Sequence, residues 1–482
     1  VMNDLEELER ALAYPWEKWT VFLHPAQRSV VEGAYSGPAR VSGSAGTGKT
    51  IVALHRAVFL SREHPDSRVL LVTFSEALAD ALQTKLRRLI GSTQPRLAER
   101  LDVHSFSEMG KRLYSLAYGA PRMASRDQIR QYLKEELAQA SDIKFGLPFL
   151  LSEWDEVVDA WQISDWEGYR DVRRLGRKTR LPEAQRSALW SVFAAVLAKL
   201  QQDLLVTEPG MFARLTKDME SRRNPPYDFI VVDEAQDISV PQLRYLTALG
   251  ADRANALFFA GDLGQRIFQQ PFSWKSLGVD IRGRAKTLQI NYRTSHQIRM
   301  QADRLLGIEV GDVDGNIEVR KGTVSVFNGP APVISIFADV KAEAAAVSEW
   351  MKARLAEGIL PEEIGIFVRS SDELSRAQDA CLASGVKFQV LDDPKDRKAN
   401  SASVCSMHLA KGLEFKVVAV MACDDEVIPS QSRIESVADG ADLEDVYATE
   451  RHLLYVACTR ARDHLLVTGV SPESEFLADL GH

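Results

Sequence analysis

Two short segments carry the residue types needed to bind and cleave a nucleoside triphosphate. The first, "GSAGTGKT" at residues 43–50, follows an apolar stretch and opens a helical pattern, which is the setting of a phosphate-binding loop. In such a loop the backbone N–H groups face a polyphosphate and a lysine, here Lys49, reaches its outer phosphates. The hydroxyl of Thr50 would hold Mg²⁺. The expected phosphate-binding residues are Gly43, Ser44, Ala45, Gly46, Thr47, Gly48, Lys49 and Thr50.

The second segment is "YDFIVVDEAQDIS" at residues 227–239, an apolar run that ends in three acids. Ionised carboxylates are costly near a core, so such a cluster needs a metal ion, a water to activate or a cationic partner. A phosphate-binding-loop enzyme needs an acid for Mg²⁺ at the end of a second strand, and Asp233 fits that role. Glu234 beside it is suited to orient or deprotonate the attacking water.

The elements that must position these residues follow a βα rhythm, which predicts parallel sheets covered by helices. Apolar strand patterns fall at 39–43, 68–74, 228–233, 255–260 and 285–290, with helical patterns at 49–62, 76–90, 239–249 and 295–306. A second series has strands at 332–337, 363–368, 386–391, 402–407, 415–421 and 463–468, with helices at 339–357, 372–384 and 446–461. Between strands of the first series lies a largely helical stretch at 105–225 that is rich in tryptophan.

The rhythm divides the chain into an α/β protein of two units with one helical insert. We expect a first domain at 1–104 plus 226–278, an insert at 105–225 and a second domain at 279–482. Because nucleotides bind at the carboxyl ends of parallel strands, the triphosphate should lie between the two domains.

Composition narrows the class of protein. The net charge of −8 has the wrong sign for a protein that coats nucleic acid through bulk electrostatics, so any such binding must be local. One basic segment, "YRDVRRLGRKTR" at 169–180, is a candidate for such local nucleic-acid binding. It is equally well explained as a solvated helix face or loop. Four scattered cysteines argue against zinc or iron–sulfur ligation and for a reducing, cytoplasmic location. No apolar run is long enough to cross a bilayer, so we expect no membrane partner.

The amino-acid sequences of seven further segments point to a particular protein family. In chain order they are "FLHPAQRSVV", "LLVTFSEALADAL", "VHSF", "GDLGQRIF", "INYRTS", "SMHLAKGLEF" and "ERHLLYVACTRAR". Together with "VVDEAQD" they resemble the UvrD/Rep family of superfamily 1 helicases in order and spacing. The resemblance implies two RecA-like domains and ATP- and Mg²⁺-dependent movement along single-stranded DNA. It also implies 3′ to 5′ polarity and the unwinding of tailed duplexes.

The resemblance assigns roles around the triphosphate. Arg293 and Arg460 would be arginine fingers supplied by the second domain, where they neutralise charge that develops during hydrolysis. Their alternative is a structural ion pair. Gln265 would sense the γ-phosphate, so we expect the catalytic set to be Lys49, Glu234, Gln265, Arg293 and Arg460.

Four further residues take their expected roles from the same family. Gln27 would read adenine and Tyr292 would stack on it, whereas Glu414 and Lys411 lie in the motif that couples the nucleotide to the strand. We accordingly expect Gln27, Tyr292 and Glu414 to bind ATP, and Thr50 and Asp233 to bind the metal.

Single strands are held by aromatic platforms and backbone contacts. Phe74, His104, Phe106 and His408 match family positions on the strand, although a lone His or Phe is more often core packing. After "GDLGQRIF" the family's second stacking aromatic is missing, so either Trp274 replaces it or this stacking step is absent. Glu76 and Ala77 stand where the family commonly has Asn and Lys, which removes a polar and a cationic contact.

The family's accessory domain 2B has no room here, because only "LDDPKDRKANSA" separates the strand at 386–391 from the motif at 406–415. We therefore expect a protein lacking 2B, in which the motor is either constitutively open or relies on a partner or flanking domain to split a duplex. The alternative function is a helicase-like ATPase that remodels a protein partner, such as RNA polymerase, without unwinding.

Overall fold

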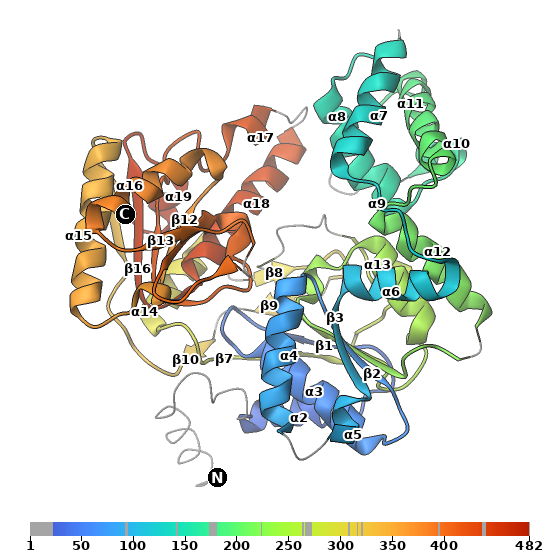
Figure 1. The fold of residues 1–482 in the computed structure, drawn as a ribbon, viewed down its shortest axis with the longest axis horizontal. Coiled ribbons are helices and arrows are strands. Elements are labelled where there is room, and N and C mark those ends of the chain that lie inside the picture. The colour runs from blue at the N-terminus through green and yellow to red at the C-terminus, as the bar shows by residue number, and fades with distance from the viewer. Residues whose placement is uncertain are drawn as a thin grey trace.

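The protein consists of two α/β lobes with a helical insert standing on the first (Figure 1). The computed structural model describes residues 23–91, 95–140, 143–172, 181–222, 224–262, 265, 272–306, 309–315, 317–319, 322–393, 396–435 and 440–481. We call the two α/β units the first and second lobe.

The first lobe is built on a sheet of six parallel strands in the order β3-β2-β4-β5-β1-β6. The strands are β1 (Ala39–Ser42), β2 (Val69–Thr73), β3 (Leu101–Ser105), β4 (Phe229–Val232), β5 (Leu257–Ala260) and β6 (Ala285–Thr287). Apolar side chains alternate between its two faces, so the sheet has a separate core on each side.

Helices cover both faces of this sheet. One core is closed by α2 (Pro25–Val31), α3 (Lys49–Glu63), α4 (Glu76–Ile90) and α5 (Pro95–Ala98). The other is closed by α6 (Phe106–Tyr118), α12 (Glu208–Ser221) and α13 (Val240–Gly250).

The boundaries expected from the sequence are too wide for the insert and too narrow for the first lobe. Phe106 and Phe212, on α6 and α12, are buried in the core of the first lobe rather than in the insert. Residues beyond 278 also belong to the first lobe, because Ile281 lies in its core and β6 pairs with β1. Helices at the base of an insert belong to the lobe whose sheet they cover. A run of helical patterns in the sequence does not show which sheet a helix packs against.

The insert has its own core, formed around Trp154, Tyr169 and Phe193. Its helices are α7 (Arg126–Gln139), α8 (Leu147–Glu153), the π-helix η2 (Trp154–Val158), α9 (Asp159–Trp161), α10 (Trp166–Asp171) and α11 (Glu183–Gln202). The chain enters and leaves it at one place, where Val206 N donates to Arg122 O (2.9 Å) and Ala124 N donates to Val206 O (3.0 Å). Most of the basic segment proposed for nucleic acid, residues 173–180, lies outside the described residues.

The second lobe carries another six-stranded parallel sheet, in the order β11-β16-β15-β12-β14-β13. Its strands are β11 (Val333–Phe337), β12 (Ile364–Val368), β13 (Phe388–Val390), β14 (Ala402–Ser406), β15 (Phe415–Val420) and β16 (Ala461–Val470). Its helices are α14 (His296–Ala302), α15 (Val340–Ala356), α16 (Leu374–Ser384), α17 (Gln431–Glu435), α18 (Gly440–Cys458) and α19 (Glu475–Asp479). Two small sheets pair β7 (Ile290–Asn291) with β10 (Val324–Ser325), and β8 (Glu309–Gly311) with β9 (Ile317–Val319).

The two series of predicted βα elements are confirmed as two parallel sheets flanked by helices. Strand β3 was not predicted as a strand, and the pattern at 285–290 divides into β6 and β7, which belong to different sheets. Between β13 and β14 the chain has only residues 391–401. Among the described residues, no helix is both long and apolar enough to cross a membrane.

Candidate nucleotide and strand site

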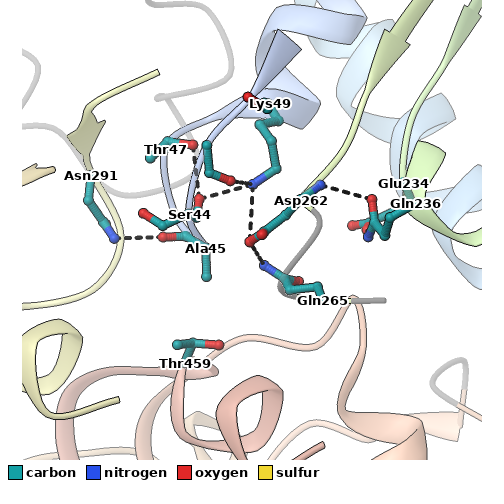
Figure 2. A network of polar contacts seen from close by, with 12 residues as sticks. Ser44, Ala45, Thr47, Lys49, Glu234, Gln236, Asp262, Gln265, Asn291 and Thr459 are labelled. Carbon is teal, nitrogen blue, oxygen red and sulfur yellow. Dashed lines mark hydrogen bonds and ion pairs between the residues drawn. The ribbon is translucent and has the colours of Figure 1, made fainter. Parts of the chain in front are cut away.

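The loop at 43–50 curls around the ammonium group of Lys49 (Figure 2). Lys49 Nζ donates to Gly43 O (2.6 Å) and Ser44 O (2.9 Å), and it lies 3.7 Å from Asp262 Oδ2. The loop follows β1 and opens α3, so its N–H groups lie at a helix N-terminus that favours anions. Ser44, Ala45 and Thr47 are buried and form the base of the loop.

Two glycines of the loop are required by close approaches from outside it. Gly46 and Gly48 have φ values of +84° and +83°, in the left-handed region that side chains disfavour. A Cβ on Gly46 would lie 2.5 Å from Asn291 Oδ1, and one on Gly48 would lie 2.5 Å from Gln27 Nε2. The glycines therefore leave space for α2 and for the segment leading into the second lobe to pack against the loop.

Gln27 and Tyr292, the two residues proposed to contact the base, lie at the same end of the loop. Gln27 is buried and its Nε2 donates to Thr47 O (3.1 Å), while its Oε1 accepts from His24 N (3.1 Å). Tyr292 N donates to Gly46 O (2.9 Å), and the Tyr292 and His24 rings lie 6.2 Å apart.

Asp233 and Thr50, the two residues proposed to bind Mg²⁺, lie next to each other. Asp233 follows β4, and Thr50 is the last residue of the loop. Burial, and then the neighbouring charge of Glu234, raise the pKa of Asp233 to about 7, and a hydrogen bond from the Thr50 hydroxyl opposes the rise. A nearby cation would stabilise the ionised form of this buried carboxylate. Carboxylate and hydroxyl oxygens are the ligands that Mg²⁺ takes alongside phosphate and water, so Asp233 and Thr50 fit the ion.

Glu234 is held in a strained conformation by groups from both lobes. Its φ is +56°, which is rare for a residue with a side chain and is typical of functional sites. Its Oε2 accepts from Gln236 Nε2 (2.5 Å) and lies 3.4 Å from Lys411 Nζ of the second lobe. Burial alone would raise the pKa of Glu234, but Lys411 and Lys49 outweigh it and lower the pKa. The Glu234 side chain is therefore an anion.

Of the two predicted arginine fingers, Arg293 is bonded to the second lobe and Arg460 reaches a first-lobe side chain. Arg293 Nη1 donates to Glu414 Oε1 (2.6 Å) and its Nη2 donates to Thr459 O (3.3 Å). Arg460 Nη2 donates to Gln265 Oε1 (3.1 Å), and burial followed by repulsion from Arg293 lowers the pKa of Arg460 to about 10.

One cavity of about 250 Å³ between the lobes collects these side chains. Twelve of the residues expected at the ATP site line it: Gln27, Gly46, Gly48, Lys49, Thr50, Asp233, Glu234, Gln265, Tyr292, Arg293, Glu414 and Arg460. Lys85 and Arg88 of α4 also line it and were not expected from the sequence, because they lie in an ordinary amphipathic helix pattern.

Asp262 is a second residue that the sequence reasoning missed. It follows β5, the sheet neighbour of β4, and it accepts from Gln265 Nε2 (2.8 Å) while its backbone N–H donates to Gln236 Oε1 (3.0 Å) (Figure 2). A similar signal was present at Asp262, which follows an apolar strand after one intervening residue, Gly261.

A groove of about 440 Å³ between the lobes brings together two residues proposed for the strand, Phe74 and His408. Burial, and then the charge of Arg369, lower the pKa of His408 to about 4, so this imidazole is neutral near pH 7. The same groove is lined by Glu76, Asp392 and Asp393, which make it unusually acidic for a nucleic-acid track.

Three other proposed strand residues have different surroundings. Phe106 is buried in the first-lobe core, with its ring centroid 6.2 Å from that of Phe212, so the expectation of a stacking platform there is wrong. Trp274 packs edge-on against Phe259 at 4.9 Å. His104 lies at the end of β3, where Nδ1 is 3.1 Å from Glu108 Oε2 and Nε2 is 3.1 Å from Arg112 Nη1.

Comparison with curated proteins gives relatives that are named as DNA helicases. ATP-dependent DNA helicase UvrD2 of Mycobacterium tuberculosis is 25% identical over 389 residues, which cover 73% of this chain and 53% of the relative. A probable DNA helicase of Mycoplasma pneumoniae is 23% identical over 456 residues, covering 90% and 81%. DNA helicase IV of Escherichia coli is 24% identical over 496 residues, covering 91% and 67%. The chain spans about half the length of the first of these relatives.

Two family domains match this chain, one starting in each lobe. The UvrD/REP helicase N-terminal domain matches residues 23–272, more than half of the chain, and the UvrD-like helicase C-terminal domain matches residues 391–471. Both matched regions contribute residues to the cavity between the lobes. The chain therefore belongs to the UvrD/REP helicase family.

Proposed function

We propose that this chain is an ATP-driven motor that moves 3′ to 5′ along single-stranded DNA and unwinds tailed duplexes. The observation that carries the proposal is the single cavity in which Lys49 and Glu234 of the first lobe face Arg293 and Arg460. Residues on both sides of the junction between the lobes are needed for one reaction, so hydrolysis is linked to how the lobes meet.

The chemistry follows from the groups that line the cavity. Glu234 accepts a proton from a water whose oxygen bonds to the γ-phosphorus, while the bond from that phosphorus to the β–γ bridging oxygen breaks. ADP leaves with the electron pair, and inorganic phosphate is the other product. Lys49, Arg293 and Arg460 stabilise the charge that spreads over the phosphoryl oxygens. Mg²⁺, held by Thr50 and Asp233, would supply further positive charge beside the outer phosphates.

Movement requires that the strand contact both lobes. Phe74, from the first lobe, and His408, from the second, line the same groove, so a strand held there would contact both. Closure and opening of the cavity during each cycle would change the spacing of these two contacts and shift the strand. The short connection at 391–401 supports a motor without 2B, in which a partner or flanking domain contacts the duplex.

Duplexes with a 3′ or a 5′ single-stranded tail test the proposal directly. Wild type should unwind the 3′-tailed duplex only, and Lys49→Ala should unwind neither because the cation facing the phosphates is gone. Equal unwinding of both tails, or unwinding by Lys49→Ala, would contradict the motor.

A second candidate is an ATPase that remodels a protein partner. The acids Glu76, Asp392 and Asp393 in the groove favour it, because they suit a cationic protein segment better than a phosphate backbone. This candidate predicts weak stimulation of ATP hydrolysis by oligo(dT) and strong stimulation by the partner. Strong stimulation by oligo(dT) alone would exclude it.

A further inference from the structure

A pocket of about 110 Å³ opens in the first lobe, at the end of the sheet opposite the nucleotide cavity. Arg68, directly before β2, and Tyr227, just before β4, line it, whereas Asp233 and the phosphate-binding loop follow their strands. Helices α6, α12 and α13 supply most of the remaining wall (Figure 1). Among the described residues, it shares none with the nucleotide cavity or with the groove proposed for the strand. We call it the arginine pocket, after Arg68, Arg112 and Arg222.

The hydroxyl group of Tyr245 is an unsatisfied polar group at this pocket. Tyr245 lies on α13 and is 0% exposed, and among the described residues its hydroxyl has no hydrogen-bond partner. Burial, and then the neighbouring Tyr227, raise the pKa of Tyr245, and Arg222 and Asp218 act on the same hydroxyl. These three neighbours all line the arginine pocket, so the hydroxyl end of the side chain faces it. A buried tyrosine hydroxyl normally has a partner, and an oxygen atom of a bound ligand would supply one here.

The arginines give the pocket wall an excess of positive charge, in a chain whose net charge is −8. Asp218 is the only carboxylate among the described lining residues, and it pairs with Arg222 at 2.9 Å. Arg68 pairs with Asp102 at 3.1 Å beside the pocket. Arg112 bonds to a histidine ring nitrogen and, among the described residues, to no carboxylate. All three arginines are exposed, so their guanidinium groups are available to carboxylates of a partner.

The size and the apolar wall of the pocket indicate that its occupant is a single apolar side chain. Pockets for small-molecule ligands usually measure about 300–1,000 Å³, so this one is too small for a nucleotide. Leu215 and Met219 are buried at the pocket, and Leu116 beside them is 79% exposed. A phosphate backbone has no apolar group to place against these side chains. An apolar amino acid flanked by acidic ones matches both the apolar wall and the arginines.

We propose that the arginine pocket binds an acidic segment of a partner protein, which places one apolar side chain against Leu116, Leu215 and Met219. Carboxylates beside that side chain accept hydrogen bonds from Arg112 and the other two arginines. The Tyr245 hydroxyl donates to an oxygen atom of the segment and so gains the partner that it lacks. The pocket is separate from the nucleotide cavity, so the inference does not rest on the proposed motor function.

Fluorescence anisotropy with labelled peptides tests the inference on the whole chain. The probes are peptides of aspartate and glutamate that differ only in one central residue, which is glycine, leucine, methionine or phenylalanine. At least one peptide with an apolar centre should bind about tenfold more tightly than the glycine peptide, because it buries an apolar side chain. A lysine-rich peptide with a central leucine should not bind. Absence of binding by every acidic peptide, or equal binding of the glycine peptide, overturns the inference.

Two variants locate the binding at the pocket. Arg112→Ala should weaken the tightest peptide by about tenfold or more, because a charge-assisted hydrogen bond is lost. Tyr245→Phe should weaken it by about threefold or more without lowering the melting temperature, because the hydroxyl has no partner to lose in the free protein. Arg282→Ala is the matched control, since Arg282 is an exposed arginine of the same lobe that pairs with Asp280 outside the pocket. Wild-type affinity in Arg112→Ala would refute the assignment.

Duplex DNA is the competing occupant, because guanidinium groups also bind phosphate. Blunt duplex DNA should leave the tightest peptide bound to the wild type. Displacement of the peptide by the duplex, together with weaker duplex binding by Arg112→Ala, would assign the pocket to nucleic acid and overturn the inference.

Discussion

Arg460 Nη2 donates a hydrogen bond to Gln265 Oε1 at 3.1 Å, and this bond joins the last motif of the second lobe to the first lobe. Gln265 in turn donates to Asp262, which lies 3.7 Å from the Lys49 ammonium group. Arg460, the proposed arginine finger, and Lys49, the lysine proposed to bind phosphate, are therefore the two ends of one short chain of polar contacts.

Arg460→Ala should lower kcat for ATP hydrolysis by about 1000-fold or more, because the arginine stabilises charge that develops only during the reaction. Binding of a fluorescent ADP analogue should change little, since the analogue lacks the γ-phosphate. Arg451→Ala is the matched control, because Arg451 is on α18 and pairs with exposed Asp479. A variant whose analogue affinity falls as much as its kcat would show that Arg460 acts mainly on binding or folding.

Asp233→Asn should raise the Mg²⁺ concentration needed for half-maximal hydrolysis by about tenfold or more, because the amide keeps the shape and loses the charge. Chelation of the metal should abolish hydrolysis by the wild type. Asp252→Asn, an exposed change after α13, serves as the control in the same Mg²⁺ titration. An unchanged Mg²⁺ requirement in Asp233→Asn would remove that residue from the metal site.

Trp274→Ala should destabilise the first lobe by about 2–3 kcal/mol, less than for a fully buried tryptophan because the ring is half-buried against Phe259. Chemical denaturation measures this change, and fluorescence anisotropy of labelled oligo(dT) measures strand affinity. We expect lost stability with unchanged affinity per folded molecule. Unchanged stability with weakened oligo(dT) affinity would show instead that Trp274 contacts the strand.

Asp159 anchors the base of the insert, where it accepts hydrogen bonds from Thr207 (2.7 Å) and Gln162 (2.6 Å). Burial raises the pKa of Asp159 to about 7. The folded protein therefore holds the proton of Asp159 more tightly than the unfolded chain does. The contribution of Asp159 to the free energy of unfolding is greatest below the unfolded pKa of about 4, and it is lost as the pH rises through about 7.

Asp159→Asn removes that titration while keeping an oxygen that accepts both hydrogen bonds. Its melting temperature relative to wild type should therefore be higher at about pH 8 than at about pH 5. Thermal denaturation at the two values checks the sign. A difference between variant and wild type that is the same at both pH values would show that Asp159 does not titrate in this range.

The sequence by itself determined the local chemistry and the class of fold. Glycines with a lysine after an apolar strand predict a phosphate-binding loop, and acids after another strand predict residues for the metal and the attacking water, because both patterns depend on neighbours in the chain. The two βα series likewise predicted two parallel sheets, since hydrophobic periodicity is set within each element.

Tertiary structure decided which side chains meet across the lobes and which candidate aromatics are core. Phe106 and Phe74 look alike in sequence, yet one packs against Phe212 and the other lines the groove, because the difference depends on helices distant in the chain. The ion pair between Lys411 and Glu234 joins positions far apart in sequence. No local pattern encodes such a contact, because it arises only when the two lobes pack against each other.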